Sequence, residues 1–186
     1  MSNPTQAPQF QAPPTPPAPT EAPKQLRTAS TFMFVLLLIG LVSMVIDFVV
    51  AGTVADTLAG KVTGLDGKPV TSSWFNPGTM YVTLVFGLII GILGLPVRKG
   101  SNGARITGAI FAIIFTLMGL GSMAMTVLIS GTADLAAKNA GLGMIVPNWY
   151  WAGGVLIGLL QVVFSILAIV KLFNSNSAAY CKAPKA

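Results

Sequence analysis

Few side chains of this chain are equipped for chemistry. Its 186 residues include five acidic side chains, no histidine and a single cysteine, Cys181. No Cys/His metal site can be assembled from this set. The sequence also has no GxSxG-type nucleophile motif and no paired carboxylates for general acid–base catalysis. We therefore expect a protein that is not an enzyme and that holds no metal or other cofactor.

Asp47 is the side chain that points to a function, because the apolar run around it is otherwise uncharged. An ionisable group in a membrane segment is costly and marks a functional site by default. We expect Thr83, Ser122 and Thr126 at a similar depth on neighbouring helices, and Gln161 near the middle of the last one. These residues predict a polar intramembrane site for a proton, a cation or a lipid headgroup. In the alternative interpretation Asp47 reaches interfacial water or a hydroxyl, and Gln161 joins two helices.

Four apolar segments must position these residues, and their lengths match about 20 residues, the length of helix that crosses a hydrocarbon core of about 30 Å. The chain is 53% hydrophobic and 9% charged, whereas about a quarter of residues are charged in soluble domains. The sequence predicts an all-α, integral membrane four-helix bundle within residues 31–172. The predicted helices cover about 31–51, 79–97, 106–129 and 150–170, with outer loops at 53–78 and 130–148 and an inner loop at 98–105.

The charges between the segments predict the orientation. Three basic residues, Lys61, Lys68 and Lys138, fall on one side of the predicted membrane, and the other eight of the 11 fall on the opposite side. The positive-inside rule then places both termini in the cytoplasm. We expect the plasma (inner) membrane of a bacterium. The basic residues form no stripe interleaved with aromatic side chains, so we expect membrane lipids as partners and no nucleic acid.

Both ends of the chain are predicted as tails. Residues 1–30 hold eight of the thirteen prolines, and such a segment cannot bury enough apolar area to offset its ordering entropy. It predicts a disordered, proline-rich cytoplasmic tail. The tail is either a solvated spacer or, through its PxxP spacing, a ligand for a cytoplasmic partner. Residues 173–186 are predicted as a flexible cytoplasmic C-terminal tail.

A repeated phrase predicts an internal duplication. GLVSM at 40–44 recurs as GLGSM at 119–123, and each copy is followed at the same distance by Gly-Thr, at 52–53 and at 131–132. Both copies start on the same side, so they predict two parallel-repeat helical hairpins related by a pseudo-two-fold axis along the membrane normal. The alternative is convergence between helices that share a topological position.

Two further sets of residues belong to this architecture. Small residues let helix backbones approach closely, and GxxxG patterns on the second and fourth segments favour such packing. The predicted packing residues are Gly40, Gly87, Gly91, Gly119, Gly154 and Gly158. The predicted outer-loop caps are Thr53, Asp56, Thr132 and Asp134, which would begin two short outer helices, the second of them ended by Gly141. The stretch GSNG at 100–103 is predicted to be a turn.

The layout of the whole chain, with its tail QAPPTPPAPTEAP, resembles small four-span actinobacterial membrane proteins with a proline-rich cytoplasmic tail. The resemblance implies a non-enzymatic accessory or scaffold subunit that packs through its glycine-rich helix faces onto a larger membrane complex, of the respiratory or cell-envelope kind. One alternative is a small transporter or channel that uses Asp47 at a pseudo-symmetric helix interface. Another is a lipid-binding or envelope-sensing protein. The partner, the ligand and the oligomeric state are not defined by the sequence.

Overall fold

The computed structural model is all-helical over the residues that it describes, which are 22–58, 77–139, 141 and 147–182. Within these ranges the side chains of 51, 53–58, 77–80, 129 and 131–139 are not described. The helices are α1 (Lys24–Leu58), α2 (Pro77–Arg98), α3 (Asn102–Asn139), α4 (Asn148–Leu172) and α5 (Ser175–Lys182).

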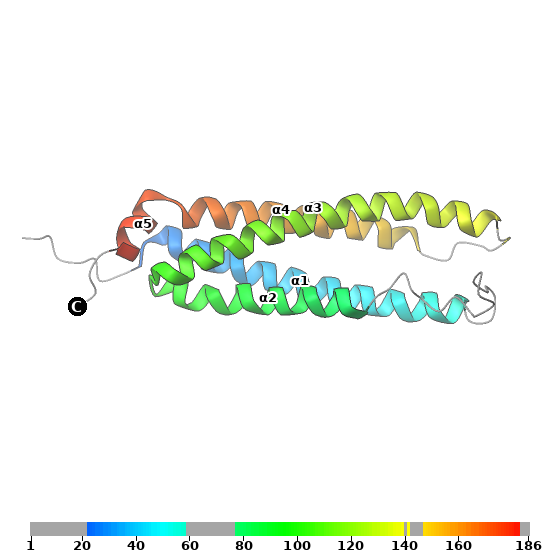
Figure 1. Cartoon of the computed structure of the whole chain (residues 1–186), viewed down its shortest axis with the longest axis horizontal. Helices are drawn as coiled ribbons and strands as arrows, with labels where there is room; N and C mark the ends of the chain where they lie inside the picture. The colour runs from blue at the N-terminus through cyan, green and yellow to red at the C-terminus, as the bar shows by residue number, and fades with distance from the viewer. Residues whose placement is uncertain (1–21, 59–76, 140, 142–146, 183–186) are drawn as a thin grey trace, which may run out of the picture.

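The four long helices form an elongated up-and-down bundle (Figure 1). α1 packs against α2 and α4, and α3 packs against the same two helices, so α1 and α3 occupy opposite corners. Such diagonal placement is what a duplicated hairpin requires. The two seams between the hairpins differ, however, because α2 and α3 contact each other much less extensively than α1 and α4 do. The duplication itself remains a prediction.

The two ends of the bundle differ. α1 and α3 begin, and α2 and α4 end, at the end that also carries α5, which we call the terminal end (Figure 1). The opposite end, where α1 runs on to Leu58 and α3 to Asn139, is called the loop end.

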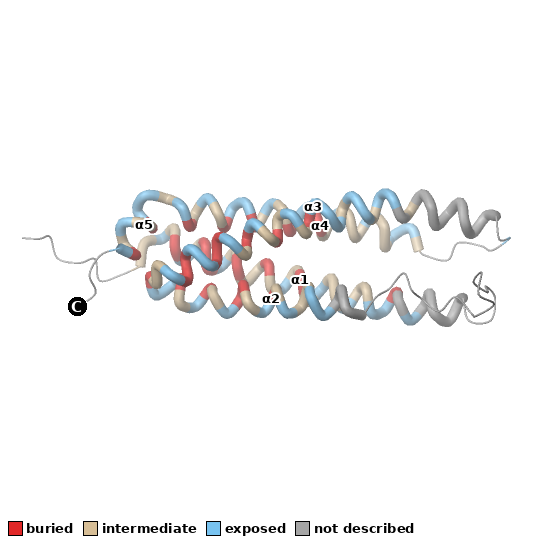
Figure 2. Tube along the Cα trace, viewed as in Figure 1, coloured by how far each residue is buried: buried red, intermediate tan, exposed pale blue. Residues whose placement is uncertain are grey.

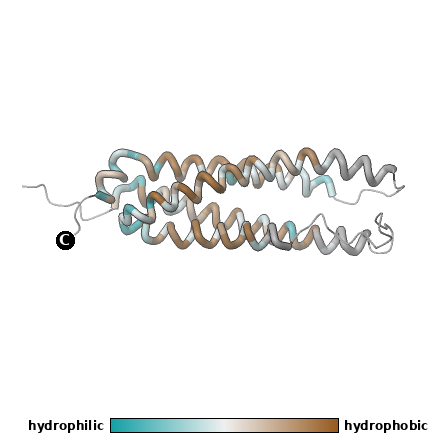
Figure 3. The backbone as a smooth tube through the Cα atoms, viewed as in Figure 1, coloured by the Kyte–Doolittle hydropathy of each residue, from teal (hydrophilic) through white to brown (hydrophobic). Residues whose placement is uncertain are grey.

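The four predicted apolar segments all form long helices. Four helical segments are long and apolar enough to cross a membrane, namely Lys24–Val50, Tyr81–Arg98, Asn102–Leu128 and Asn148–Leu172. Large apolar side chains remain exposed on the outside of the bundle, with Phe48 75% and Leu117 64% accessible. Figure 3 shows the apolar residues along the middle of all four helices. A surface of this kind is suited to lipid.

The most tightly packed part of the core lies toward the terminal end (Figure 2). Leu26, Met33, Leu36, Phe115 and Leu172 are each at most 1% accessible. Two aromatic pairs connect the hairpins there. Phe32 of α1 meets Phe164 of α4 with ring centroids 5.7 Å apart. Across the other seam, Phe86 of α2 meets Phe111 of α3 at 5.6 Å.

The predicted packing glycines contact helices of their own chain. A Cβ added to Gly119 or to Gly158 would lie 3.0 Å from the carbonyl oxygen of the other. On α2, a Cβ at Gly91 would lie 2.7 Å from a methyl carbon of Leu37. Gly87 faces Leu37 as well, Gly154 faces Thr126, and Gly40 lies beside the backbone of Thr83 at an ordinary contact distance. The glycines therefore bring α1 against α2 and α3 against α4.

The first helix begins earlier than predicted. α1 starts at Lys24, directly after Pro23, so residues 24–30 are helical and do not belong to the tail. Leu26 and Ala29 are fully buried. The predicted helix starts at residue 31 because Lys24 and Arg27 precede the uninterrupted apolar run. Both residues lie at the terminal end of α1, where long basic side chains can reach polar surroundings. The rest of the proline-rich tail, residues 1–21, lies outside the described residues.

The predicted outer helices do not exist as separate elements. Thr53 and Asp56 lie inside α1, and Thr132 and Asp134 lie inside α3, so none of them caps a new helix. The intervening residues are mostly Ala, Leu and other residues that tolerate helix, and so the spans simply continue. Gly141 takes a φ of 65° two residues after α3 ends, as expected for a helix-ending glycine. Residues 59–76, 140 and 142–146 lie outside the described residues.

The terminal end also differs from the prediction. The inner connection is the turn 99–101 alone, around Gly100 with a φ of 78°, so Arg105 belongs to α3 instead of a loop. The C-terminal segment forms α5, whose Ser177 and Cys181 are buried. The Ser177 hydroxyl donates to the carbonyl of Lys171 at 2.9 Å. A segment that is polar overall docks here because its few small or apolar residues share one face.

Candidate functional site

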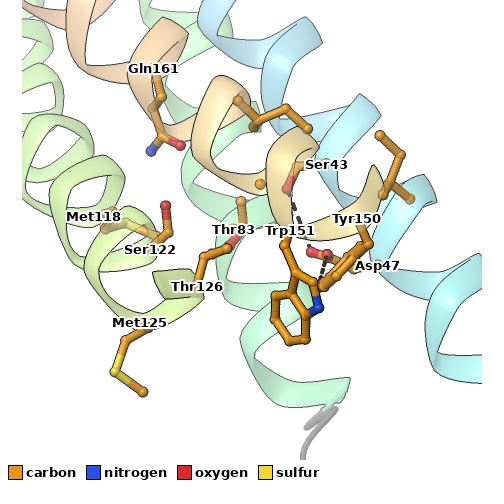
Figure 4. A pocket seen from close by; sticks show the side chains of 13 residues that line it. Ser43, Asp47, Thr83, Met118, Ser122, Met125, Thr126, Tyr150, Trp151 and Gln161 are labelled. Carbon is orange, nitrogen blue, oxygen red and sulfur yellow. Dashed lines mark hydrogen bonds between the residues drawn. The ribbon is translucent and has the colours of Figure 1, made fainter. Parts of the chain in front are cut away.

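A cavity of about 390 Å³ lies among the four helices, in the half of the bundle nearer the loop end (Figure 4). Its walls come from all four long helices. The described lining residues are Ser43, Ile46 and Asp47 of α1, Thr83 of α2, Met118, Ser122, Met125 and Thr126 of α3, and Tyr150, Trp151, Gly154, Ile157 and Gln161 of α4.

The structure brings the five residues of the predicted polar site around this one cavity. Asp47, Thr83, Ser122, Thr126 and Gln161 all contribute to its wall. Helical periodicity explains the gathering, because residues three or four apart share a face of a helix. The cavity is polar on several sides although it lies within segments that are apolar as a whole.

Asp47 accepts two hydrogen bonds from neutral hydroxyl groups. Tyr150 donates to Oδ1 at 3.0 Å across the α1–α4 seam. Ser43, one turn earlier on α1, lies 3.5 Å from Oδ2, which is the long limit for a hydrogen bond. None of the described lining residues is lysine or arginine. The carboxyl group therefore has hydrogen-bond donors but no positive partner in the wall.

Aromatic rings form the wall beside Asp47. The rings of Tyr150 and Trp151 are 5.3 Å apart in an edge-on arrangement, and both residues line the cavity. Trp149 is 56% accessible and lies outside it. The three consecutive aromatic residues therefore lie on two different surfaces. Trp149 is on the outside of the bundle, where it suits a membrane interface, and Tyr150 and Trp151 line the cavity.

A hydrogen bond between α4 and α3, together with the packed core, closes the end of the cavity that is nearer the terminal end. Gln161 is 8% accessible, and its Nε2 donates to the carbonyl of Phe115 at 3.1 Å. This bond ties α4 to α3, which is the helix-joining role considered from the sequence. Leu36, Ile90 and Phe115 are at most 1% accessible and fill the core on the terminal side of this level.

Sequence reasoning missed part of the site. Ser43 enters the sequence analysis only as part of the repeated phrase, and Tyr150 and Trp151 are not among the predicted site residues. Tyr150 lies 103 positions from Asp47, and nothing in the sequence shows that α1 and α4 are neighbours. Among the described residues there is no group of three His, Cys, Asp or Glu side chains placed to hold a metal ion.

Comparison of the chain with protein-family models, curated proteins and solved structures produced no match in any of the three. Any function must therefore be argued from the chain's own residues.

Proposed function

We propose that the protein is a multi-pass protein of a bacterial plasma membrane that binds a small organic cation in the loop-end cavity. The observation that supports this proposal is the setting of Asp47, a carboxyl group in the wall of a 390 Å³ cavity whose described lining includes no basic residue. The proposal develops the transporter alternative drawn from the sequence.

A cationic ligand would supply the positive charge that the described wall of the cavity lacks. A carboxylate inside a bilayer is costly unless it is paired. Tyr150 and Ser43 offer hydrogen bonds but no positive charge. A cation placed between Asp47 and the faces of Tyr150 and Trp151 would gain both Coulomb attraction and cation–π attraction.

The size and chemistry of the wall favour an organic cation over a bare metal ion. Calcium takes six to eight oxygen ligands at about 2.3–2.6 Å, usually with several carboxylates, whereas the described wall has one carboxyl group. The remaining oxygens belong to hydroxyl and carboxamide groups on different helices. The volume of about 390 Å³ lies in the range of about 300–1,000 Å³ that is usual for small-molecule sites. A substituted ammonium ion fits this combination.

We expect the ligand to enter from the loop end. The buried core, with Leu36, Ile90 and Phe115, lies between the cavity and the terminal end. With both termini in the cytoplasm, as the basic residues favour, entry from the loop end would be entry from the outer side. Transport of the ligand would then require the terminal half of the bundle to open.

The first experiment measures binding. Thermal unfolding of the purified protein in detergent is followed with increasing tetramethylammonium chloride, and sodium chloride at equal ionic strength serves as the control. We expect tetramethylammonium to raise the unfolding temperature of the wild type and of Asp47→Glu, but not of Asp47→Asn. An equal rise in Asp47→Asn would remove this carboxyl group from the proposed site.

A second experiment separates transport from binding alone. The protein is reconstituted in liposomes, and uptake of radiolabelled tetramethylammonium is compared between the wild type, Asp47→Asn and empty vesicles. Uptake that requires Asp47 supports a transporter. Binding without uptake supports a receptor or sensor that uses the same cavity.

The accessory-subunit hypothesis needs a partner-binding surface other than the glycine-rich helix faces. All six predicted packing glycines are engaged by the chain's own helices. The observation that favours a partner is the α2–α3 seam, the least extensive of the four seams between neighbouring long helices. A helix of a larger membrane complex would complete this side. Stoichiometric co-purification after extraction in mild detergent tests the hypothesis, with crosslinks expected from α2 and α3.

A further inference from the structure

Arg105 is a buried cation near the start of α3, at the terminal end. The residue is 8% accessible. Its Nε and Nη1 atoms are buried and have no hydrogen-bond partner among the described residues. It plays no part in the loop-end cavity, and the sequence treated it only as a loop residue that sets the membrane orientation.

The position of Arg105 follows from helix geometry. Ala109 and Ala112, four and seven residues further along α3, are at most 2% accessible, so Arg105 continues the buried face of the helix. α3 and α4 are antiparallel and meet at Gly119 and Gly158. Moving fourteen residues toward the terminal end from each glycine leads to Arg105 and Leu172. Arg105 therefore lies near the level where α4 ends and α5 follows.

A lone guanidinium group in this position is expensive. Arginine keeps its positive charge in proteins, and a buried ion without a partner costs several kcal/mol. Asn102, three residues earlier on the same helix, has an Oδ1 that is also buried and has no hydrogen-bond partner among the described residues. A carboxamide oxygen can accept hydrogen bonds, but it cannot neutralise a charge.

The chain offers almost no acid to neutralise Arg105. Three of its five acidic residues, Asp47, Asp56 and Asp134, lie in the loop half of α1 or α3, and a fourth, Asp66, lies outside the described residues. The fifth, Glu21, lies outside the described residues. Basic residues, in contrast, collect at the terminal end, with Arg98 and Lys99 at the end of α2 and Lys171 at the end of α4.

We propose that Arg105 anchors an oxyanion site that takes a phosphate group. The guanidinium group matches phosphate in charge and in hydrogen-bond geometry. The span of α3 begins at Asn102, which places Arg105 close to the boundary where lipid phosphates lie. The nearby first turn of α3 adds backbone N–H groups that favour anions. The phosphate comes either from an anionic phospholipid headgroup or from free phosphate.

The test compares the unfolding temperatures of the wild type and Arg105→Met without and with a phosphate ligand. We expect the order of the two temperatures to reverse. Met keeps the length of the side chain without its charge. In delipidated detergent without phosphate we expect Arg105→Met to unfold at a higher temperature than the wild type, because the uncompensated charge is gone. With phosphatidylglycerol or inorganic phosphate added, we expect the wild type to gain stability and the variant to gain none.

Binding is measured directly by native mass spectrometry of the protein with phosphatidylglycerol, and with phosphatidylcholine as the neutral control. Arg105→Gln should weaken phosphatidylglycerol retention at least about tenfold, the effect of losing charge-assisted hydrogen bonds. Arg98→Gln is the matched control, because Arg98 carries the same charge at the same end but is exposed. It should retain lipid nearly as the wild type does.

The outcomes identify the source or overturn the site. A gain in stability from inorganic phosphate alone assigns the site to free phosphate, and a gain only from phosphatidylglycerol assigns it to lipid. If Arg105→Met lowers stability under every condition and Glu21→Gln does the same, Arg105 is neutralised within the chain and the proposal is wrong. Equal lipid loss in Arg98→Gln and Arg105→Gln also contradicts it, because only general surface charge would then be at work.

Discussion

The hydroxyl of Tyr150 donates to Asp47 Oδ1 at 3.0 Å and so joins the first membrane span to the last. The two residues lie on antiparallel helices that also meet further inside, at the ring pair Phe32–Phe164. A polar link near the loop end and an aromatic contact nearer the terminal end together hold the α1–α4 seam. The same hydroxyl belongs to the wall of the cavity, so the bond is both structural and part of the candidate site.

Replacing Tyr150 with Phe should destabilise the bundle by about 1.5–3 kcal/mol, the usual range for a hydrogen bond to a charged group. The ring and its packing are kept, and only the donor to Asp47 is lost. Unfolding in detergent by increasing SDS measures the change. Tyr81→Phe removes the same atom from a residue that is 65% accessible at the same end, and it should change stability by less than about 0.5 kcal/mol.

Replacing Gly158 with Ala should separate α3 from α4. The new Cβ would lie 2.5 Å from Met123 Cγ and 3.0 Å from the Gly119 carbonyl oxygen. We expect a loss of about 1–3 kcal/mol, as for other overpacked sites. Gly153→Ala is the control on the same helix, because its Cβ would meet nothing within 4 Å. It should stabilise the helix by about 0.5–1 kcal/mol. Equal effects of the two changes would contradict the described α3–α4 contact.

The thiol of Cys181 should react slowly with maleimide reagents in the folded protein. Cys181 is 8% accessible because α5 docks against the ends of the long helices. A cysteine at the exposed position Ala179, introduced together with Cys181→Ala, should react rapidly. Similar fast rates at both positions would show that α5 does not dock and that the C-terminal segment is a flexible tail.

Cysteine labelling in intact cells tests the orientation of the bundle. In a Cys181→Ala background, Thr53→Cys and Thr132→Cys should react with a membrane-impermeant maleimide from outside. Ala179→Cys should react only after permeabilisation, since it lies at the terminal end, which the basic residues place in the cytoplasm. The reverse pattern would invert the topology and with it the side from which the cavity is reached.

The sequence predicted the spans well and their ends poorly. Long apolar runs are a strong signal because a bilayer demands them. Helix ends depend on weaker preferences, and Thr53 and Thr132 resemble caps although the helices pass through them. α5 was missed because eight mostly polar residues have no signal apart from the surface on which they dock.

The sequence by itself determined that four apolar segments are long enough to cross a membrane as helices, that Asp47 stands alone among apolar neighbours, and that basic residues collect at one end. These properties are local, because they follow from composition and from spacing along one helix. Only the tertiary structure decided that α1 lies beside α4, that Tyr150 therefore meets Asp47, and that Arg105 is buried with no hydrogen-bond partner for its Nε and Nη1 among the described residues. Contacts between helices depend on how whole faces pack, and every apolar helix offers several faces that a single sequence cannot rank.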